Sequence, residues 1–348
     1  MKININILNN AYKTLKRALA VKTNILLEQD KLIAYKGDII IHVPLEMEET
    51  FDKPVYIDKG FFEKLKNIKE EFIDVDFDKG VAKVNNVMFA TNHSISEDIV
   101  PVCLTNNVIE EIQLSYEDIK KFYELYDFIA KDDIRPVLQC INWNRDTICS
   151  LDGYRLSKKT ITSELVNEFN INGEVAKILS KLVKKDYTCR FIFTEDIVNV
   201  IVMNKDKVIA DIFSKLGENN FIKYNTLINL YDENARYITL DPTILVENLK
   251  FVKDNMAKTV GLHFNKDGYK ISNFKSKTEI TVSDSLYKTK DLEDEGFEIY
   301  CNYQYLYDSL KTKKNIVDIQ LRSKVSPINI LTNDDKDVDL ILPVRVSE

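Results

Sequence analysis

Glycine, proline and histidine are scarce in this sequence, and each shortage narrows the possibilities. The 348 residues include 9 Gly, 7 Pro and 3 His. So few Gly and Pro residues favour regular helices and strands joined by short turns. None of the histidines, His42, His93 and His263, has a plausible partner nearby in the sequence, so we expect each on a surface or a strand face. The sequence contains no phosphate-binding loop, dinucleotide-binding glycine motif or nucleophile elbow, the usual sequence signs of an enzyme.

Cysteines and long apolar runs are also few. The five cysteines are scattered without the spacing of a metal site: Cys103, Cys140, Cys149, Cys189 and Cys301. Neither Cys140 nor Cys149 has basic neighbours that would lower the pKa of its thiol, so a redox role is not favoured. We expect free, buried thiols in a reducing compartment. Without a signal-like start or a run of about 18 apolar residues, the predicted location is cytoplasmic.

Apolar and charged residues make up 45% and 30% of the chain, which is the composition of a folded protein. The length allows two or three domains, each with its own core. Six segments share one plan, in which a strand end is followed by Asn, Asp or Ser and then by a Lys-rich amphipathic helix. The small polar residue can accept hydrogen bonds from the free amides of the first helical turn. These segments begin at Ile7, Ile57, Leu114, Ile171, Leu240 and Cys301.

The six segments recur at intervals of roughly 50 to 70 residues, with short alternating stretches between them. Each unit is therefore one helix plus about four antiparallel strands. Pairs of units predict an α+β protein of three domains, at residues 1–105, 106–232 and 233–348. The alternative is that the helices of an ordinary α+β protein happen to fall at these intervals.

Charge is distributed unevenly along the chain. The formal net charge of −7 by itself argues against a nucleic acid partner. Over the six helical segments, however, Lys and Arg outnumber Asp and Glu by nine, so the remaining residues carry −16. If every helix packs on a sheet, the Lys-bearing faces point away from the sheets. Such faces suit the phosphate backbone of a nucleic acid, although lysine is also common on solvated helices and two of the six segments are near neutral.

One acidic set could carry chemistry. Asp74, Asp76 and Asp78 alternate in FIDVDFDKG and could present three carboxylates to a metal ion. They do not fit a calcium loop, because Lys79 stands where that loop needs Gly and Asn85 where it needs Glu. The alternation predicts instead a half-exposed strand with its acidic residues outward. We expect no metal and no cofactor, and a metal-dependent phosphoryl-transfer enzyme remains an alternative.

The stretch ICSLDGYRLSKKT, residues 148–160, has two interpretations. Asp152-Gly153 between apolar runs predicts a tight hairpin turn. Asp152, Tyr154 and Arg155 within four residues could equally form a catalytic loop. The residues alone leave both interpretations open.

Several stretches resemble the bacterial DNA polymerase III β subunits, the sliding clamps. RPVLQCINW (135–143), followed by ICSLDGYRLSKK, is similar to the Arg-x-x-Leu-Asn-Gly and Thr-Asp-Gly-His-Arg-Leu-Ala stretches of that family's middle domain. FIKY (221–224) stands where the family has Phe-Pro-Asp-Tyr. IYCNYQYLYDSLK (299–311) resembles Phe-Asn-x-x-Tyr-Leu-x-Asp-x-Leu, and VDLILPVRVSE (338–348) resembles the closing Met-Pro-Met/Val-Arg-Leu. The resemblance runs the whole length of the chain with the elements in the same order.

The resemblance implies three tandem DNA-clamp domains, each with two helices on curved antiparallel sheets. Two chains would close into a homodimeric ring around double-stranded DNA, with the helices lining the hole. Such a ring slides without reading sequence and tethers the replicative DNA polymerase, and a clamp loader places it on DNA. This function needs no catalytic residue, no cofactor and no membrane.

The resemblance also implies three sets of site residues. A pocket for partner peptides would be formed by Leu138, Gly153, Tyr154, Arg155, Leu156, Ile222, Leu227, Leu340, Leu342, Pro343, Val344 and Arg345. DNA would be faced by Lys13, Lys16, Arg17, Lys64, Lys66, Lys177, Lys181, Lys184, Lys185, Lys311, Lys313 and Lys314. The dimer interface would join Phe89 of one chain to Phe251 and Val252 of the other.

The sequence departs from the family in the pocket motifs. Tyr154 replaces the usual His, Leu151 the usual Thr, Ile222 the usual Pro, and Val344 stands where Met is frequent. These changes suggest a divergent member, with a pocket suited to a variant peptide. They also leave open a clamp-fold interaction protein, or a replisome inhibitor, that docks partners without enclosing DNA.

Overall fold

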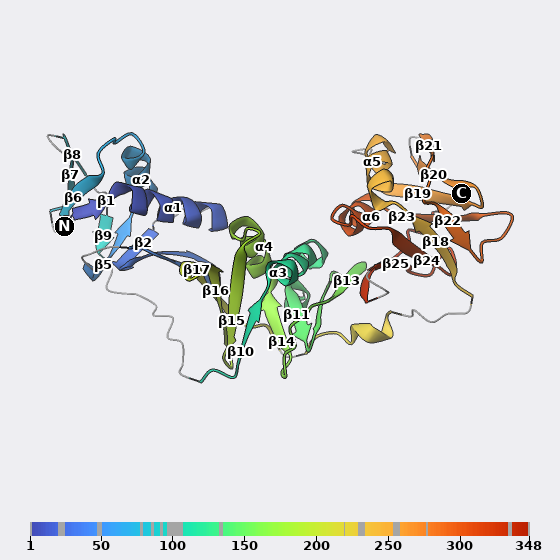
Figure 1. The fold of residues 1–348 in the computed structure, drawn as a ribbon, viewed down its shortest axis with the longest axis horizontal. Helices are drawn as coiled ribbons and strands as arrows, with labels where there is room; N and C mark the ends of the chain where they lie inside the picture. Colours follow the sequence, from blue (N-terminus) through green and yellow to red (C-terminus); the bar gives the residue numbers. More distant parts are fainter. Residues whose placement is uncertain are drawn as a thin grey trace. The chain divides into compact units, whose positions relative to one another are not determined.

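A computed structural model describes residues 2–19, 25–46, 51–76, 79–84, 87–90, 93–95, 107–131, 135–218, 220–228, 234–252, 258–275, 278–332 and 336–346. Backbone contacts divide the chain into two compact units. The first comprises residues 1–123 and 165–217, and the second comprises residues 124–164 and 218–348 (Figure 1). Residues 106–232, the predicted middle domain, contribute to both units. Sheet pairing crosses both predicted boundaries, because β4 (Ile39–Pro44) pairs with β17 (Lys207–Lys215) and β13 (Arg155–Thr160) pairs with β26 (Asp337–Ile341). The three-domain division therefore stays a prediction.

The first unit contains an antiparallel four-stranded sheet, in the order β1-β6-β7-β8, and an antiparallel nine-stranded sheet, β10-β15-β16-β17-β4-β3-β2-β5-β9. Its strands are β1 (Lys2–Asn4), β2 (Ile25–Gln29), β3 (Lys31–Lys36), β4 (Ile39–Pro44), β5 (Phe51–Ile57), β6 (Phe72–Asp76), β7 (Val81–Val84), β8 (Val87–Ala90), β9 (His93–Ile95), β10 (Glu110–Leu114), β14 (Phe169–Asn172), β15 (Tyr187–Phe193), β16 (Ile197–Asn204) and β17 (Lys207–Lys215). Its helices are α1 (Ile5–Leu19), α2 (Lys59–Leu65), α3 (Tyr116–Glu124) and α4 (Gly173–Leu182). Helix α1 packs on β3 and β4 and contacts α2 and α4.

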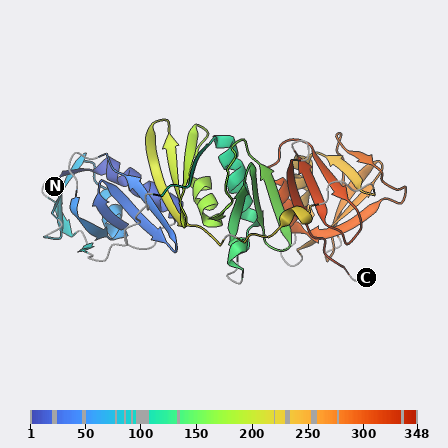
Figure 2. The ribbon, with the colours of Figure 1, turned by 90° about the horizontal axis from the view of Figure 1, so that it is seen from below.

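The second unit repeats this plan. It contains the antiparallel run β11-β12-β13-β26-β25-β24-β18-β22 and the four-stranded antiparallel sheet β21-β20-β19-β23, whose strands are coloured from green to red in Figure 2. Its strands are β11 (Cys140–Asn144), β12 (Thr147–Leu151), β13 (Arg155–Thr160), β18 (Arg236–Leu240), β19 (Thr259–Asn265), β20 (Gly268–Asn273), β21 (Glu279–Val282), β22 (Lys288–Lys290), β23 (Phe297–Asn302), β24 (Val317–Leu321), β25 (Ile328–Thr332) and β26 (Asp337–Ile341). Its helices are α5 (Pro242–Val252), α6 (Tyr303–Leu310) and the short 3-10 helices η1 (Leu125–Phe128), η2 (Pro136–Gln139) and η3 (Tyr224–Thr226).

The predicted helix-plus-strands repeat is confirmed in the described part of the chain. Six α-helices are present, and four or five strands separate each helix from the next. Three of the predicted polar helix caps are also confirmed. The side chains of Asp58, Asn172 and Asn302 each accept a hydrogen bond from a first-turn amide at 2.6–2.9 Å. The α+β class with antiparallel sheets is therefore confirmed.

The first helix begins earlier than its sequence pattern predicts. The helix starts at Ile5, and the side chain of Asn4 caps it by accepting from the amides of Asn6 and Ile7 at 2.9 and 3.2 Å. The i, i+3, i+4 apolar stripe extends back to Ile5, which is buried with Leu8. Alternation in residues 3–7 fits a strand equally well, so the sequence cannot place this boundary.

The acidic stretch is a half-exposed strand, as its alternation predicts. In β6, Ile73 and Val75 are buried while Asp74 is exposed, and Asp76 forms an ion pair with Lys79 at 3.0 Å. Asp78 lies outside the described residues. Among the described residues, no group of three or more His, Cys, Asp or Glu side chains is placed to hold a metal ion.

The described cysteines are buried and free, as predicted: Cys140, Cys149, Cys189 and Cys301. Burial raises the pKa of Cys140 to about 11 and that of Cys301 to about 12. Cys103 lies outside the described residues. Within the described ranges, no helix is both long enough and apolar enough to cross a membrane.

His42 makes the first unit sensitive to acid. Its ring lies half-buried in β4, 4.8 Å from the ring of Phe213. Burial, aided by the charge of Lys31, lowers the pKa of His42 from 6.5 to about 4. The unfolded chain therefore binds the proton more readily, and stability falls as pH drops from about 6.5 to about 4. Because the ring is only partly buried, we expect a loss of about 2 kcal/mol rather than the full value of the shift.

Urea unfolding followed by circular dichroism checks this expectation. The free energies of unfolding of the wild-type protein and His42→Gln should diverge between pH 7 and pH 4.5. Only the wild type should lose the additional stability that comes from protonation of His42. Parallel pH profiles for the two proteins would contradict the assignment to His42.

Candidate functional site

The turn between β12 and β13 is a hairpin held by one carboxylate. Asp152 accepts hydrogen bonds from the amides of Tyr154 and Arg155 at 2.9 and 3.0 Å, and its own amide donates to the carbonyl of Arg155 at 3.2 Å. Gly153 has a φ of +92°, which favours glycine. The predicted hairpin is confirmed, with three residues rather than two between the strands.

The guanidinium of Arg155 is buried within the second unit. Its Nη1 donates to Asp308 of α6 at 2.8 Å, its Nε donates to Asp152 at 3.0 Å, and its Nη2 donates to the carbonyl of Asp127. The ring of Tyr305 lies 4.4 Å from the guanidinium carbon. Only 8% of the Arg155 surface is exposed. All three acceptors belong to this chain, so Arg155 links β13, α6 and η1. Its role is to support the structure around the predicted pocket.

Three predicted pocket leucines form an apolar floor. Leu138, Leu156 and Leu340 belong to one buried cluster with Ala130, Cys149, Leu151 and Tyr224. Leu156 of β13 lies directly opposite Leu340 of β26 in the sheet. Leu156 and Leu340, 184 residues apart in the sequence, are thus adjacent because strand β26 adds to the β12–β13 hairpin.

Four predicted pocket residues reach the surface, and Val137, Phe221 and Ile228 are the half-buried apolar residues that pack against the leucine cluster. Tyr154, Ile222, Leu227 and Leu342 have 60%, 39%, 48% and 39% of their surface exposed. The amide of Leu342 donates to the carbonyl of Tyr154 at 2.9 Å, which holds the C-terminal segment against the hairpin. Ile222 and Leu227 flank Tyr224, which is buried in the leucine cluster. Exposed apolar side chains of this kind are suited to contact with the apolar anchors of a short peptide.

The last residues of the predicted pocket run along β23. The amide of Val344 donates to the carbonyl of Tyr300 at 2.8 Å, and Pro343 forms a bridge with Cys301. Pro343 and Val344 are half-buried, whereas Arg345 is exposed. These contacts fix the backbone of the segment beside the pocket.

Two further residues contact residues of the predicted pocket and its hairpin. Arg135 Nη2 donates to the carbonyl of Asp152 at 3.3 Å, and a Cβ at Gly153 would lie only 3.1 Å from this guanidinium. The ring of Tyr154 stacks on that of Tyr305, with centroids 6.4 Å apart. Both residues stand within the stretches that carry the family resemblance, Arg135 at its opening Arg and Tyr305 at its Tyr. That was the signal available for finding them.

Most of the predicted DNA-facing side chains are accessible. Eight of them are exposed: Lys13, Lys16 and Arg17 on α1, Lys64 on α2, Lys66 just after α2, Lys184 and Lys185 after α4, and Lys314 after α6. Others are partly occupied: Lys177 pairs with Glu174 at 3.3 Å, Lys181 donates to the carbonyl of Ala18 at 3.2 Å, and Lys311 pairs with Asp127 and Asp308 at 2.6 and 2.7 Å.

Lys313 does not face solvent, which corrects the prediction. Its side chain is only 7% exposed and its ammonium lies 2.8 Å from Asp339, which also contacts Lys159 at 3.3 Å. Burial raises the pKa of Asp339, but the two ammonium groups outweigh this and hold the pKa below its usual value. Helix α6 ends at Leu310, so Lys313 lies beyond the helix and not on its lysine-bearing face. We leave Lys313 out of the DNA-facing set.

The predicted interface residues also differ in exposure. Phe251 at the end of α5 is 75% exposed, which suits a contact surface. Val252 is 1% exposed and packs in the core beneath α5, so we leave it out of the interface. The backbone of Phe89 lies in β8, opposite Ala82 of β7, and its side chain lies outside the described residues.

Comparison with solved structures links this arrangement to one fold. The chain is similar to the DNA polymerase sliding clamp of Bacillus subtilis, at 17% identity and a TM-score of 0.82, covering 99% of both chains. It is similar to the DNA polymerase III β chain of Streptococcus pneumoniae, at 19% identity, a TM-score of 0.81 and 99% of both chains. It is also similar to the sliding clamp of Bartonella birtlesii bound to griselimycin, at 16% identity, a TM-score of 0.79 and 99% of both chains.

The sequence itself matches no protein-family model and no curated protein. The structural likeness nevertheless extends over the full length of the chain and of each neighbour. The resemblance seen in the sequence is therefore confirmed for the fold: this chain has the fold of the bacterial DNA polymerase III β subunits, the sliding clamps.

Proposed function

We propose that this protein is a DNA sliding clamp, a processivity factor that encircles duplex DNA as a homodimeric ring in the cytoplasm. The observation that carries the proposal is the full-length match to clamp structures, with 99% of both chains covered. In this proposal each chain supplies three domains, and a clamp loader opens the ring. Encirclement makes tight binding unnecessary, because topology retains the DNA.

The basic helices support contact with DNA that is independent of sequence. Exposed Lys and Arg side chains attract phosphates without reading bases. Several of these side chains already pair with Glu or Asp, as Lys16 does with Glu63 at 3.6 Å. Weak, mobile contacts of this kind suit sliding, and the clamp role itself asks for no catalytic group.

The pocket around the β12–β13 hairpin supports tethering of the replicative polymerase. Its buried leucine floor and exposed Tyr154, Ile222, Leu227 and Leu342 suit a peptide with apolar anchors. The clamp loader would use the same pocket. Tyr154, with its ring on Tyr305, distinguishes this pocket from the His-containing pocket of the family motif.

Replacing Phe251 by aspartate tests the ring interface. An exposed aromatic side chain at an interface contributes through desolvation, so a carboxylate there should convert the dimer to a monomer at micromolar concentration. Light scattering measures the mass directly. Val325→Asp, which alters another exposed apolar residue of the same unit at 60% exposure, should leave the dimer intact.

The mass of the wild-type protein in the same light-scattering measurement distinguishes the two candidate functions, a ring-forming clamp and a clamp-fold interaction protein. A dimer supports the ring, whereas a wild-type monomer would favour a clamp-fold interaction protein that does not enclose DNA. If Phe251→Asp remained a dimer, the dimer interface would not include Phe251.

A further inference from the structure

The outer face of the four-stranded sheet β21-β20-β19-β23 carries a polar cluster that the proposed clamp function does not use. In β19, Val260, Leu262 and Phe264 are buried against the core, so Gly261 and His263 face outward. The sheet register places Ser272 of β20 opposite Gly261 and Glu298 of β23 opposite His263. Directly paired residues have Cβ atoms about 5 Å apart, so these side chains meet on one surface.

Three of these side chains form a continuous hydrogen-bonded series. Ser272 Oγ lies 2.7 Å from His263 Nε2, and His263 Nδ1 lies 2.9 Å from Glu298 Oε1. This order is a hydroxyl, an imidazole and a carboxylate, the order in which serine hydrolases arrange nucleophile, base and orienting acid. The side chains of His263 and Glu298 are 26% and 34% exposed, so the series is reachable from solvent.

Neighbouring residues hold the carboxylate and the imidazole in place. The hydroxyl of Tyr300 donates to the same Glu298 oxygen that faces His263, and its ring meets the imidazole edge-to-face with centroids 6.1 Å apart. Lys270, opposite His263 on β20, is held by Glu279 at 2.8 Å. A carboxylate fixed on one side can orient the imidazole on the other.

Gly261 is required by this cluster. A Cβ at this position would lie 2.6 Å from Ser272 Oγ, 2.8 Å from a Tyr300 ring carbon and 3.1 Å from His263 Nε2. Glycine weakens a strand interior, and it marks places where other groups approach the backbone closely. The position therefore leaves the space in which the hydroxyl and the imidazole meet.

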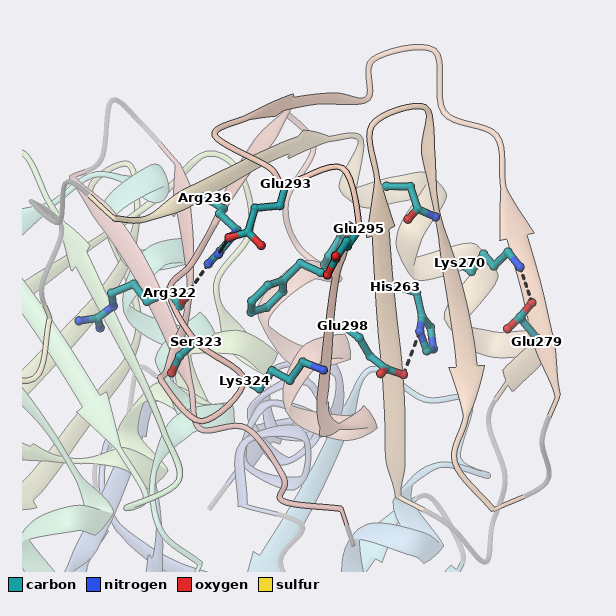
Figure 3. Close-up of a pocket in the computed structure, with 14 residues that line it drawn as sticks. Arg236, His263, Lys270, Glu279, Glu293, Glu295, Glu298, Arg322, Ser323 and Lys324 are labelled. Atoms are coloured by element: carbon teal, nitrogen blue, oxygen red, sulfur yellow. Dashed lines mark hydrogen bonds and ion pairs between the residues drawn. The ribbon is translucent and has the colours of Figure 1, made fainter. Parts of the chain in front are cut away.

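An open pocket of about 690 Å³ adjoins the cluster. Figure 3 shows His263 and Glu298 on one side of it and Arg236, Glu293 and Lys324 on the other. Two residues beyond Ser272, Phe274 is 45% exposed and its ring meets that of Tyr300 at 5.6 Å. His263 and Glu298 line this pocket, Ser272 contacts the imidazole beside it, and the exposed ring of Phe274 offers an apolar surface for an acyl group.

We propose that Ser272, His263 and Glu298 form a serine-hydrolase site for esters of short apolar carboxylic acids. Ser272 Oγ attacks the ester carbonyl while Nε2 takes its proton, and the alcohol leaves with that proton. Water then attacks the acyl carbon, giving its proton to Nε2, and Ser272 Oγ leaves and is reprotonated. The products are the acid and the alcohol. Ser272 and His263 are catalytic residues, and Glu298 is a positioning residue.

Labelling of the full chain with a fluorophosphonate probe, followed by peptide mapping, tests the proposal. The probe should modify Ser272, and the protein should hydrolyse p-nitrophenyl butyrate. Ser272→Ala should abolish the label at this position, and His263→Gln should lower the hydrolysis rate by about 100-fold, the contribution of a general base. Glu298→Gln should lower kcat with KM unchanged, which loss of the fold would not produce.

Two further variants keep the test decisive. Gly261→Ala, which displaces the hydroxyl, should also lose the label, whereas Ser285→Ala, an exposed serine away from the cluster, should label like wild type. Labelling of Ser285 as strongly as Ser272, or ester hydrolysis unaffected by Ser272→Ala, would overturn the proposal. The hydrolase proposal does not depend on ring formation. A monomeric protein with this site would still be labelled at Ser272, and a ring-forming protein without it would not.

Discussion

Replacing Arg155 by methionine is expected to lower the free energy of unfolding of the second unit by about 3 kcal/mol. Methionine fills much of the same volume but leaves the carboxylate of Asp152, which is only 13% exposed, without its cation, and it removes the ion pair with Asp308. Asp308 keeps Lys311 at 2.7 Å and Gln304 at 3.0 Å, which places the loss at the lower end of the usual range for broken buried pairs.

Tryptophan fluorescence during urea unfolding measures this loss. Trp143, the one tryptophan of the chain, is fully buried in β11 of the same unit. Arg145→Met is the matched control, because Arg145 pairs with Glu164 on the surface, where both side chains are more than half exposed. The control should change stability by less than about 1 kcal/mol. Equal effects from the two variants would show that the Arg155 network does not support the fold.

Deleting residues 344–348 is expected to weaken binding of a polymerase-derived peptide by at least about 100-fold, or about 2.7 kcal/mol. The deletion removes Val344, whose amide donates to Tyr300, and so releases the segment that carries Leu342 beside the hairpin. It also removes the exposed Arg345. Fluorescence anisotropy with a labelled peptide that carries Leu and Phe anchors measures the affinity.

A second variant separates loss of the pocket from loss of the fold. Leu342→Ala shortens one exposed side chain, at 39% exposure, and should weaken the peptide while leaving the urea midpoint unchanged. Val166→Ala, at 89% exposure in the other unit, should leave both quantities unchanged. Unchanged peptide affinity after the deletion would show that the C-terminal segment is not part of the peptide-binding pocket.

Local chemistry in the sequence predicts the helices, their caps and the hairpin. Asp152-Gly153 predicts its turn because the carboxylate of Asp152 reaches the amides two and three residues later and Gly153 accepts a positive φ. Asn302 predicts a helix start for the same kind of reason. The alternating Asp74 and Asp76 predict a half-exposed strand. Each of these features depends on residues within a few positions of one another.

Features that depend on distant residues could not be predicted in this way. Lys313 is buried because Asp339, on a strand 26 residues later in the chain, lies beside it, and nothing near Lys313 in the sequence signals that partner. Phe251 and Val252 are adjacent and both apolar, yet the end of α5 turns one outward and the other inward. The burial of Arg155 likewise depends on Asp308 of α6, which only the folded sheet brings close.

Retention on circular DNA tests the central claim most directly. The protein, loaded by a clamp loader onto nicked circular duplex DNA and passed through a gel-filtration column at high salt, should remain with the circle. Linearising the circle should release it, because a ring slides off an end, and Phe251→Asp should not be retained at all. Equal retention on circular and linear DNA, or no retention on either, would contradict the account of this protein as a sliding clamp.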